Sequence, residues 1–383
     1  QFSTGPSLLV QPKGAAGGPS AFRGLAVRWQ SLEAPPPYLQ QANLTLQREI
    51  MGQWVVSASY SGSRGVHIPG SNYNLNQLDP KYYLEYGLAL QNQVANPFYG
   101  QIASGGLAGA TVSRAQLLLP YPDYGSVMTM ANHGNSSSYH SGQFTLEKRY
   151  AKGISALISY TGSKLIDESF SSAGSSGETG DFRIGRLNRR GDRAIDQNDV
   201  SQRMVASGVF EMPFGKGKKF ASDAPMAVDY IIGGWQVNTI TTIQTGTPLS
   251  VRGANNNALN WPNVTKDPTL KGEDRGVSKW FDTTAFANPP NFVVGNAPRT
   301  LPNTRGPGMV SMDLSAFKNF RLREHSVVEF RAEAFNFLNH VNLNNPGTTF
   351  SPNAAGVNTN ASFGVITSSM KARSVQLGLR LTF

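Results

Sequence analysis

The sequence predicts an all-β protein, an antiparallel up-and-down transmembrane β-barrel portion of about ten strands with short periplasmic turns and long extracellular loops. Three observations predict this fold. Apolar and polar residues alternate strictly in many runs, the connections between these runs are alternately short and long, and aromatic residues lie beside the short connections. All three features are typical of strands that cross a bilayer.

The last ten residues, 374–383, show the alternation most clearly, because every second side chain from Val375 to Phe383 is apolar. One face of such a strand is apolar and the other is polar. About ten residues is also the length at which a tilted strand crosses a bilayer. The same period fits the last strand of a soluble β-sandwich, so the rest of the chain must decide between the two.

The composition narrows the class of protein. Forty Gly and 23 Pro among 383 residues indicate many turns and long loops, and the absence of Cys fits a cell envelope without disulfides. No apolar run approaches the roughly 20 residues of a membrane-spanning helix, so a membrane protein of this sequence must be a barrel. The net charge of +10 is carried by scattered basic residues, which argues against nucleic-acid binding. No signal peptide precedes Gln1, so we expect either a mature secreted chain or the C-terminal part of a longer protein.

The alternating runs give the expected order of elements. Residues 1–22 form an irregular lead-in, and residues 23–383 form the barrel part. The expected strands are a weak one at 25–31, closed by Pro35, Pro36 and Pro37, and then 42–47, 54–61, 143–150, 155–161, 204–212, 235–244, 312–316, 328–334 and 374–383. Residues 324–341 contain many helix formers, but the alternation of Glu329, Arg331 and Glu333 favours a strand there.

The lengths of the connections favour the membrane barrel over the sandwich. Short connections are expected at 50–52, 151–153, 213–232 and 321–325, and long ones at 63–136, 165–200, 250–308 and 338–371. Outer-membrane barrels have short periplasmic turns and long outer loops, whereas nothing in a sandwich requires every second loop to be long. Counting back from Phe383 puts all four short connections on the periplasmic side and gives ten strands with the weak first one included.

The positions of aromatic and charged residues agree with the predicted strand faces and periplasmic end. We expect Trp54, Tyr150, Phe214, Trp235 and Phe320 to form a periplasmic aromatic girdle. Outward-facing Arg48, Lys148 and Lys318 lie near short turns, where a charge in lipid costs about 0–1 kcal/mol instead of about 2–4 kcal/mol at the midplane. The charged residues in the opposite phase are predicted to face the lumen, namely Glu147, Glu329, Arg331, Glu333 and Arg380.

No catalytic, cofactor or metal signature emerges. The five histidines lack metal-ligand spacing, and no serine lies in a nucleophile-elbow context. The loop at 165–200 holds Asp181, Asp192, Asp196 and Asp199 among five arginines, so a self-neutralising network within that loop is favoured over a calcium site. We therefore expect no enzyme activity, no cofactor and no metal.

Several stretches resemble a known family. These are 96–100 (NPFYG), 119–122 (LPYP), 159–164 (SYTGSK), 213–217 (PFGKG), 233–236 (GGWQ) and 330–340 (FRAEAFNFLNH). In order and spacing they resemble the C-terminal half of the Oar-like TonB-dependent receptors. The resemblance implies a barrel of about 22 strands with an N-terminal plug and a carboxypeptidase-regulatory-like β-sandwich before it. The plug, the β-sandwich and the segment that contacts TonB are expected to lie outside residues 1–383. Contact with TonB is therefore expected only through those absent parts.

The resulting expectation is an outer-membrane receptor-like barrel part that captures an unidentified ligand with its outer loops and takes it up. Its expected partners are outer-membrane lipid and the barrel-assembly machinery. By analogy with other outer-membrane barrels, that machinery recognises the terminal strand, here with Leu379, Leu381 and Phe383. The alternatives are a complete small porin, a barrel hydrolase, or a secreted β-sandwich adhesin.

Overall fold

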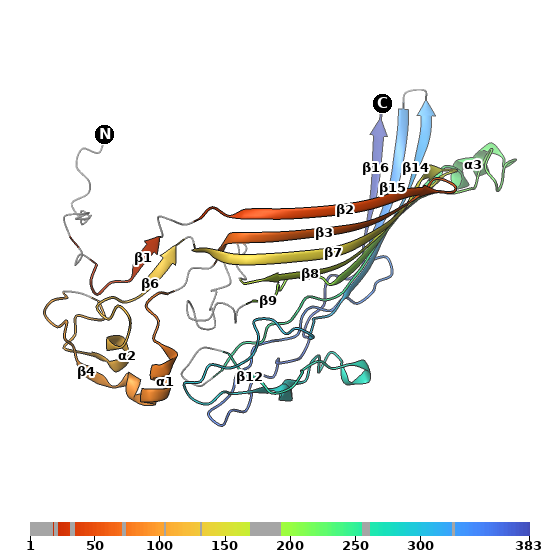
Figure 1. Ribbon diagram of the computed structural model, residues 1–383. Coiled ribbons are helices and arrows are strands. Elements are labelled where there is room, and N and C mark those ends of the chain that lie inside the picture. Colours follow the sequence, from red (N-terminus) through yellow and green to blue (C-terminus); the bar gives the residue numbers. More distant parts are fainter. Residues whose placement is uncertain are drawn as a thin grey trace, which may run out of the picture.

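One large antiparallel sheet dominates the molecule (Figure 1). The computed structural model describes residues 18, 22–30, 35–70, 74–102, 105–130, 132–168, 193–254, 261–323 and 326–383. The strands of the sheet are β2 (Tyr38–Ile50), β3 (Trp54–Gly70), β7 (Asn132–Ala151), β8 (Ile154–Asp167), β9 (Ala194–Ile195), β10 (Gln202–Glu211), β11 (Trp235–Gln244), β14 (Met309–Arg323), β15 (Ser326–Phe335) and β16 (Ser374–Thr382). Apart from the two-residue β9, which pairs with β8, each strand lies beside the next in the chain. The up-and-down prediction is confirmed.

The register aligns the apolar positions of neighbouring strands. One row of successive partners crosses seven strands through Leu46, Ala58, Phe144, Tyr160, Met204, Ile243 and Val310. Because side chains on a strand alternate between faces, partners in a row point to the same side of the sheet. The alternation in the separate strands therefore builds one continuous apolar face.

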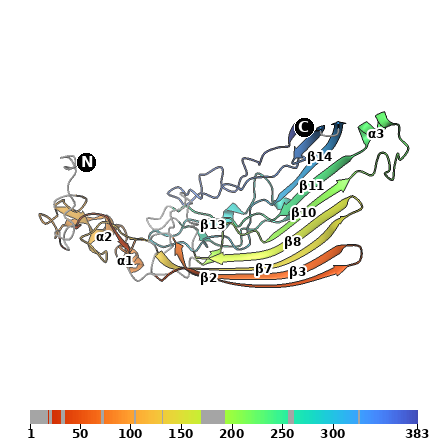
Figure 2. The ribbon, with the colours of Figure 1, turned by 90° about the horizontal axis from the view of Figure 1, so that it is seen from above.

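The two ends of the sheet differ, as the connection lengths predict. Figure 2 shows the short connections, the helix α3 and the C terminus at one end, and the long connections at the other. The turn between β7 and β8 has Lys152 and Gly153 at φ 53° and 80°, the left-handed geometry of a tight two-residue hairpin. In an outer-membrane barrel the end with short turns is periplasmic and the end with long loops is extracellular.

The first expected strand is not part of this sheet. β1 (Val27–Gln30) pairs in parallel with β6 (Val127–Met130) in a separate two-stranded sheet. The prediction of a strand at 25–31 is confirmed, but its place in the large sheet is wrong. The tenth strand of the large sheet is β9. A short alternation identifies a strand and its faces but does not identify the strand with which it pairs. Of the expected lead-in 1–22, all but Gly18 and Phe22 lie outside the described residues.

The connections contain short elements that alternation could not predict. The first long connection holds α1 (Pro80–Tyr86), η2 (Gly87–Gln91), β4 (Gln93–Ala95), β5 (Thr111–Ser113) and α2 (Arg114–Leu117), and the connection after β10 holds α3 (Met226–Ile232). Asp79 caps α1, because its side chain accepts a hydrogen bond from the backbone N–H of Lys81. The strand predicted at 328–334 is confirmed by β15.

Among the described residues, no helix is long and apolar enough to cross a membrane.

The sheet is open at both edges. Within the described residues β2 pairs only with β3 and β16 only with β15, and every residue of both edge strands is exposed. An open edge presents unpaired backbone N–H and C=O groups.

Candidate ligand site in the outer loops

The long connections after β11 and β15 fold together at the outer end of the sheet. We call residues 245–308 and 336–373 the loop body; its short elements are β12 (Asn263–Val264), η5 (Gly272–Asp274), η6 (Thr283–Ala285) and β13 (Phe286–Ala287). Its core is Leu249, Val251, Phe281, Ala285, Phe286, Leu301, Phe350 and Phe363. Phe281 packs edge-on against Phe286 and Phe363 with centroid distances of 5.7 and 5.2 Å. The loops thus have a packed core of their own.

Side chains also hold the backbone of the loop body. Asp282 caps η6 by accepting hydrogen bonds from the N–H and hydroxyl of Thr284 at 3.1 and 2.8 Å, and Lys266 lies 2.6 Å from the same carboxylate. Asn353 accepts from the N–H groups of Ala355 and Val357, each at 3.0 Å. Such bonds replace the ladder of a sheet and let an irregular segment hold a defined shape.

A cavity of about 400 Å³ lies where the loop body meets β11. Arg275 stacks 4.6 Å from the ring centroid of Trp280, whose Nε1 donates to the carbonyl of Arg305 at 2.7 Å. The other lining residues are Gln244, Thr245, Gly246, Thr269, Leu270, Asn303, Thr304, Gly306 and Gly308. Arg275 and Arg305 line this cavity, but Arg305 is paired with Asp199 at 2.5 Å, so Arg275 is the cation that favours a ligand rich in hydrogen-bond acceptors.

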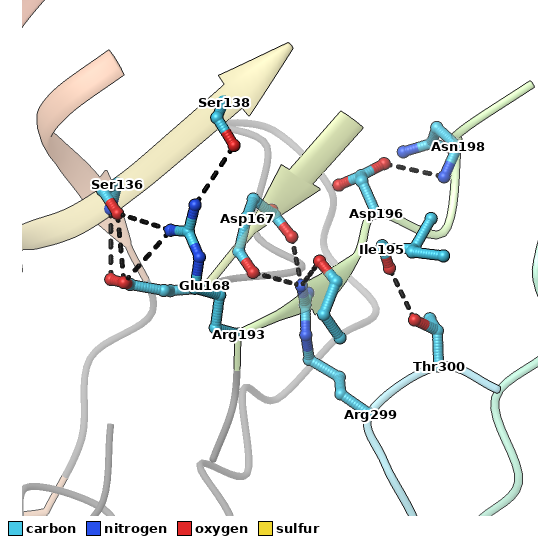
Figure 3. A network of polar contacts seen from close by, with 11 residues as sticks. Ser136, Ser138, Asp167, Glu168, Arg193, Ile195, Asp196, Asn198, Arg299 and Thr300 are labelled. Carbon is cyan, nitrogen blue, oxygen red and sulfur yellow. Dashed lines mark hydrogen bonds and ion pairs between the residues drawn. The ribbon is translucent and has the colours of Figure 1, made fainter. Parts of the chain in front are cut away.

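Two arginines fasten the loop body to the sheet. Arg299 is 3% exposed; its Nη2 donates to the carboxylate of Asp167 and, at 2.9 Å, to the carbonyl of the same residue. Arg305 donates to the carboxylate and the carbonyl of Asp199 at 2.5 and 2.8 Å. We call these four residues the arginine latch; Figure 3 shows its Asp167–Arg299 pair and, beside it, Thr300, whose hydroxyl donates to the carbonyl of Ile195 at 2.5 Å.

The latch takes Asp199 out of the network predicted within the loop at 165–200, while the described Arg193 does pair within that loop, with Glu168 at 3.6 Å. Asp167 and Asp199 pair with arginines 132 and 106 residues further along the chain. Within the predicted loop, Asp181, Arg183, Arg186, Arg189, Arg190 and Asp192 lie outside the described residues. Arg299 and Arg305 were missed because their partners are distant in sequence, and no local spacing signals such a pair.

Asp167 lies beyond the membrane-spanning part of its strand. Ten residues from the periplasmic end of β8, 154–163, are enough to cross the hydrocarbon layer. Burial raises the pKa of Asp167 to about 6 from 3.8; the Arg299 guanidinium opposes this rise and Asp196 adds to it. Because the folded pKa exceeds the unfolded one, the contribution of this carboxyl to stability is full below about pH 4 and declines as the pH rises to about 6.

This shift predicts a pH effect on the loop body. In Asp167→Asn the decline in stability between about pH 4 and 6 is expected to disappear, because the titrating group is gone. Protease resistance of the outer loops in intact cells, measured across this range, checks the expectation. Asp267→Asn is the control, since hydrogen bonds from Thr269 and Asn303 hold the pKa of Asp267 below its usual value, on the acid side of this range. An undiminished decline in Asp167→Asn would contradict the assignment.

Four of the five lumen candidates lie together. Arg331 pairs with Glu329 at 2.8 Å and lies 3.9 Å from Glu333 on β15, while Arg380 on β16 is the register partner of Glu329. Glu147 lies on β7, apart from the others, in a groove of about 490 Å³. The register puts all five on the face opposite the apolar one.

The girdle candidates Trp54, Tyr150, Phe214, Trp235 and Phe320 all lie at the short-turn end of their strands or in the connection after β10. Trp235 contacts Phe330 edge-on at 6.0 Å, Phe320 contacts Tyr230 at 5.3 Å and Phe214 contacts Phe220 at 5.6 Å. At the C terminus, Leu379, Leu381 and Phe383 are 77%, 56% and 93% exposed.

The sequence predicts that Lys318 faces outward near the lipid interface. In the structure it does not. It is 4% exposed, and its Nζ donates to the carbonyls of Tyr230 and Ile231 at 2.5 and 3.2 Å. These carbonyls belong to the last turn of α3, where the partial negative charge of a helix end attracts a cation. The helix covers this lysine, a contact that the alternation of β14 cannot reveal.

An open antiparallel sheet with one continuous apolar face and long loops at one end defines a part of an outer-membrane β-barrel. The chain belongs to the outer membrane beta barrel domain family, which matches residues 1–376, and it is located in the outer membrane. No curated protein matches it. Among solved structures it is similar to the outer membrane transporter YddB from Escherichia coli, with 8% identity and a TM-score of 0.43 over 94% of this chain and 34% of that one. The chain thus spans about a third of the length of that transporter.

Proposed function

We propose that this chain is the C-terminal part of an Oar-like TonB-dependent receptor, which captures a ligand with its outer loops and takes it up across the outer membrane. On this proposal it is not an enzyme. The barrel-assembly machinery recognises its terminal strand, and other parts of the receptor contact TonB. The loop body, with its packed core and the cavity at Arg275 and Trp280, supplies the capturing surface.

The observation that carries the proposal is the open sheet. A complete barrel of about ten strands would close β2 onto β16 and would enclose a narrow interior filled by side chains. Here both strands have one neighbour within the described residues. Two free edges favour a larger barrel, to which this chain contributes the C-terminal strands, over a small closed porin.

Cross-linking distinguishes the open sheet from a small closed barrel. The chain has no Cys, so any disulfide within it must come from an introduced pair of cysteines. Ala332 and Leu377 are register partners on β15 and β16, within reach of a disulfide, and their Cys variants should cross-link in most molecules in the outer membrane. Leu44→Cys, combined in turn with Val375→Cys, Leu377→Cys and Leu379→Cys, should not cross-link. An efficient cross-link from any of these three would support the closed barrel.

Uptake is tested by depletion of compounds from the growth medium. We would compare wild-type cells, cells that lack the gene encoding this chain, and cells that lack TonB. We expect the same compounds to remain in the medium of both deletion strains. If the protein were a porin, the compounds would remain in the medium of the gene-deletion strain only. If it were an adhesin, both deletion strains would remove the compounds like the wild type. Either outcome would contradict the proposal.

A further inference from the structure

A polar groove of about 650 Å³ lies at the outer end of the apolar face. Arg64 on β3 and His140 on β7 line it together with Tyr60, and all three share the phase of the apolar face. Arg64 lies ten residues beyond Trp54, the first residue of β3. That is about 33 Å along the strand, or about 23 Å of height at a tilt of about 45°. The groove therefore lies where the apolar band of about 25 Å ends.

A second, apolar groove of about 520 Å³ adjoins it toward the membrane centre. Leu44, Leu46, Phe144 and Tyr160 form its walls, and Tyr60 lines both grooves. The glycines on β7 and β8, Gly142 and Gly162, are register partners in this apolar groove. A Cβ at Gly142 would meet nothing within 4 Å, so the absent side chain leaves open space on the face.

Cations gather around the polar groove. Arg64 and Lys164 are exposed, and neither forms an ion pair within the described part of the chain. Lys164 is the register partner of His140, whose Nδ1 lies 2.7 Å from the hydroxyl of Tyr60. Arg193 donates to the hydroxyls of Ser136 and Ser138 at 3.0 and 3.1 Å and pairs with Glu168 at 3.6 Å (Figure 3).

A charged groove next to an apolar groove matches an amphiphile with an anionic head. We propose that the two grooves together bind one phosphorylated glycolipid of the outer leaflet. Its phosphate lies at Arg64 and Lys164, and one acyl chain lies in the apolar groove over Gly142. Cations at this level attract phosphate, while the same charges deeper in the lipid would be costly. The ligand is a component of the membrane and is distinct from any ligand captured by the loop body.

The test uses the full-length protein that contains this chain, purified in detergent, with lipid A carrying both phosphates as the probe and native mass spectrometry to count bound lipid. Arg64→Ala combined with Lys164→Ala should weaken binding at least about tenfold, because two charge-assisted contacts are lost. Gly142→Leu should weaken it as well, since the new side chain occupies the apolar groove. The matched control removes two cations of the same face at the periplasmic end, Arg48→Ala with Lys148→Ala, and should bind lipid A like the wild type.

Heat-modifiable migration on a gel shows that each variant is folded. Three outcomes would overturn the proposal. The double variant at Arg64 and Lys164 could bind lipid A like the wild type, dephosphorylated lipid A could bind equally well, or inorganic phosphate could displace lipid A at equal concentration. The second outcome would indicate a purely apolar contact, and the third a site for a free anion.

Discussion

Replacing Ala332 by Arg is expected to block assembly of the protein into the outer membrane. Ala332 lies in the middle of β15 on the apolar face, between its register partners Ala316 and Leu377. A guanidinium there would face hydrocarbon, at a cost of about 2–4 kcal/mol. Arg331→Ala, one residue away, changes the opposite face and removes ion pairs of a side chain that is 47% exposed. We expect it to cost about 1 kcal/mol or less.

The measurement is the fraction of each variant that reaches the outer membrane in heat-modifiable form. Assembly of Ala332→Arg should fall close to zero, while Arg331→Ala should assemble like the wild type. If both variants assembled to the same extent, the assignment of the apolar face to lipid would be wrong. The two residues are neighbours on one strand and occupy opposite faces of it, so the comparison reports which face lies against lipid.

Phe281→Ala is expected to unfold the loop body while leaving the sheet intact. Phe281 is fully buried and contacts Phe286 and Phe363, so its removal leaves a cavity at the centre of the core. Such substitutions cost about 3–5 kcal/mol. We expect the strands to stay folded, because their apolar side chains lie against lipid and not in the core of the loop body.

Limited proteolysis on intact cells checks this expectation, because the loop body lies on the extracellular side. The loops of Phe281→Ala should be cleaved at least about tenfold faster, while the protein still assembles. Val277→Ala, in the same segment but 50% exposed, is the control and should behave like the wild type. Failure of Phe281→Ala to assemble would show instead that the loop core is needed for insertion of the barrel.

Alternation along the chain predicted nearly all of the large sheet. A strand with lipid on one side and a polar lumen on the other needs opposite side chains at every second position, and this requirement is local. The strand positions, the apolar face of each strand and the end with short turns were therefore readable from residues such as Val375 to Phe383. Boundaries were less accurate: β3 extends to Gly70 and β7 begins at Asn132, because the outer parts of these strands lack the apolar pattern.

The candidate site was readable only in outline. Loop lengths indicated the extracellular side, but the core around Phe281, the cavity at Arg275 and Trp280, and the latch at Arg299 depend on contacts between distant segments. The pairing of β1 with β6 and the contact of α3 with Lys318 also depend on segments that are distant in sequence. The amino-acid sequence by itself determined which residues form the membrane strands and which of their faces is apolar, because both follow from the two-residue repeat of a strand. Only the tertiary structure decided which loops pack together and which charges pair, because the residues involved are more than a hundred positions apart in the case of the latch.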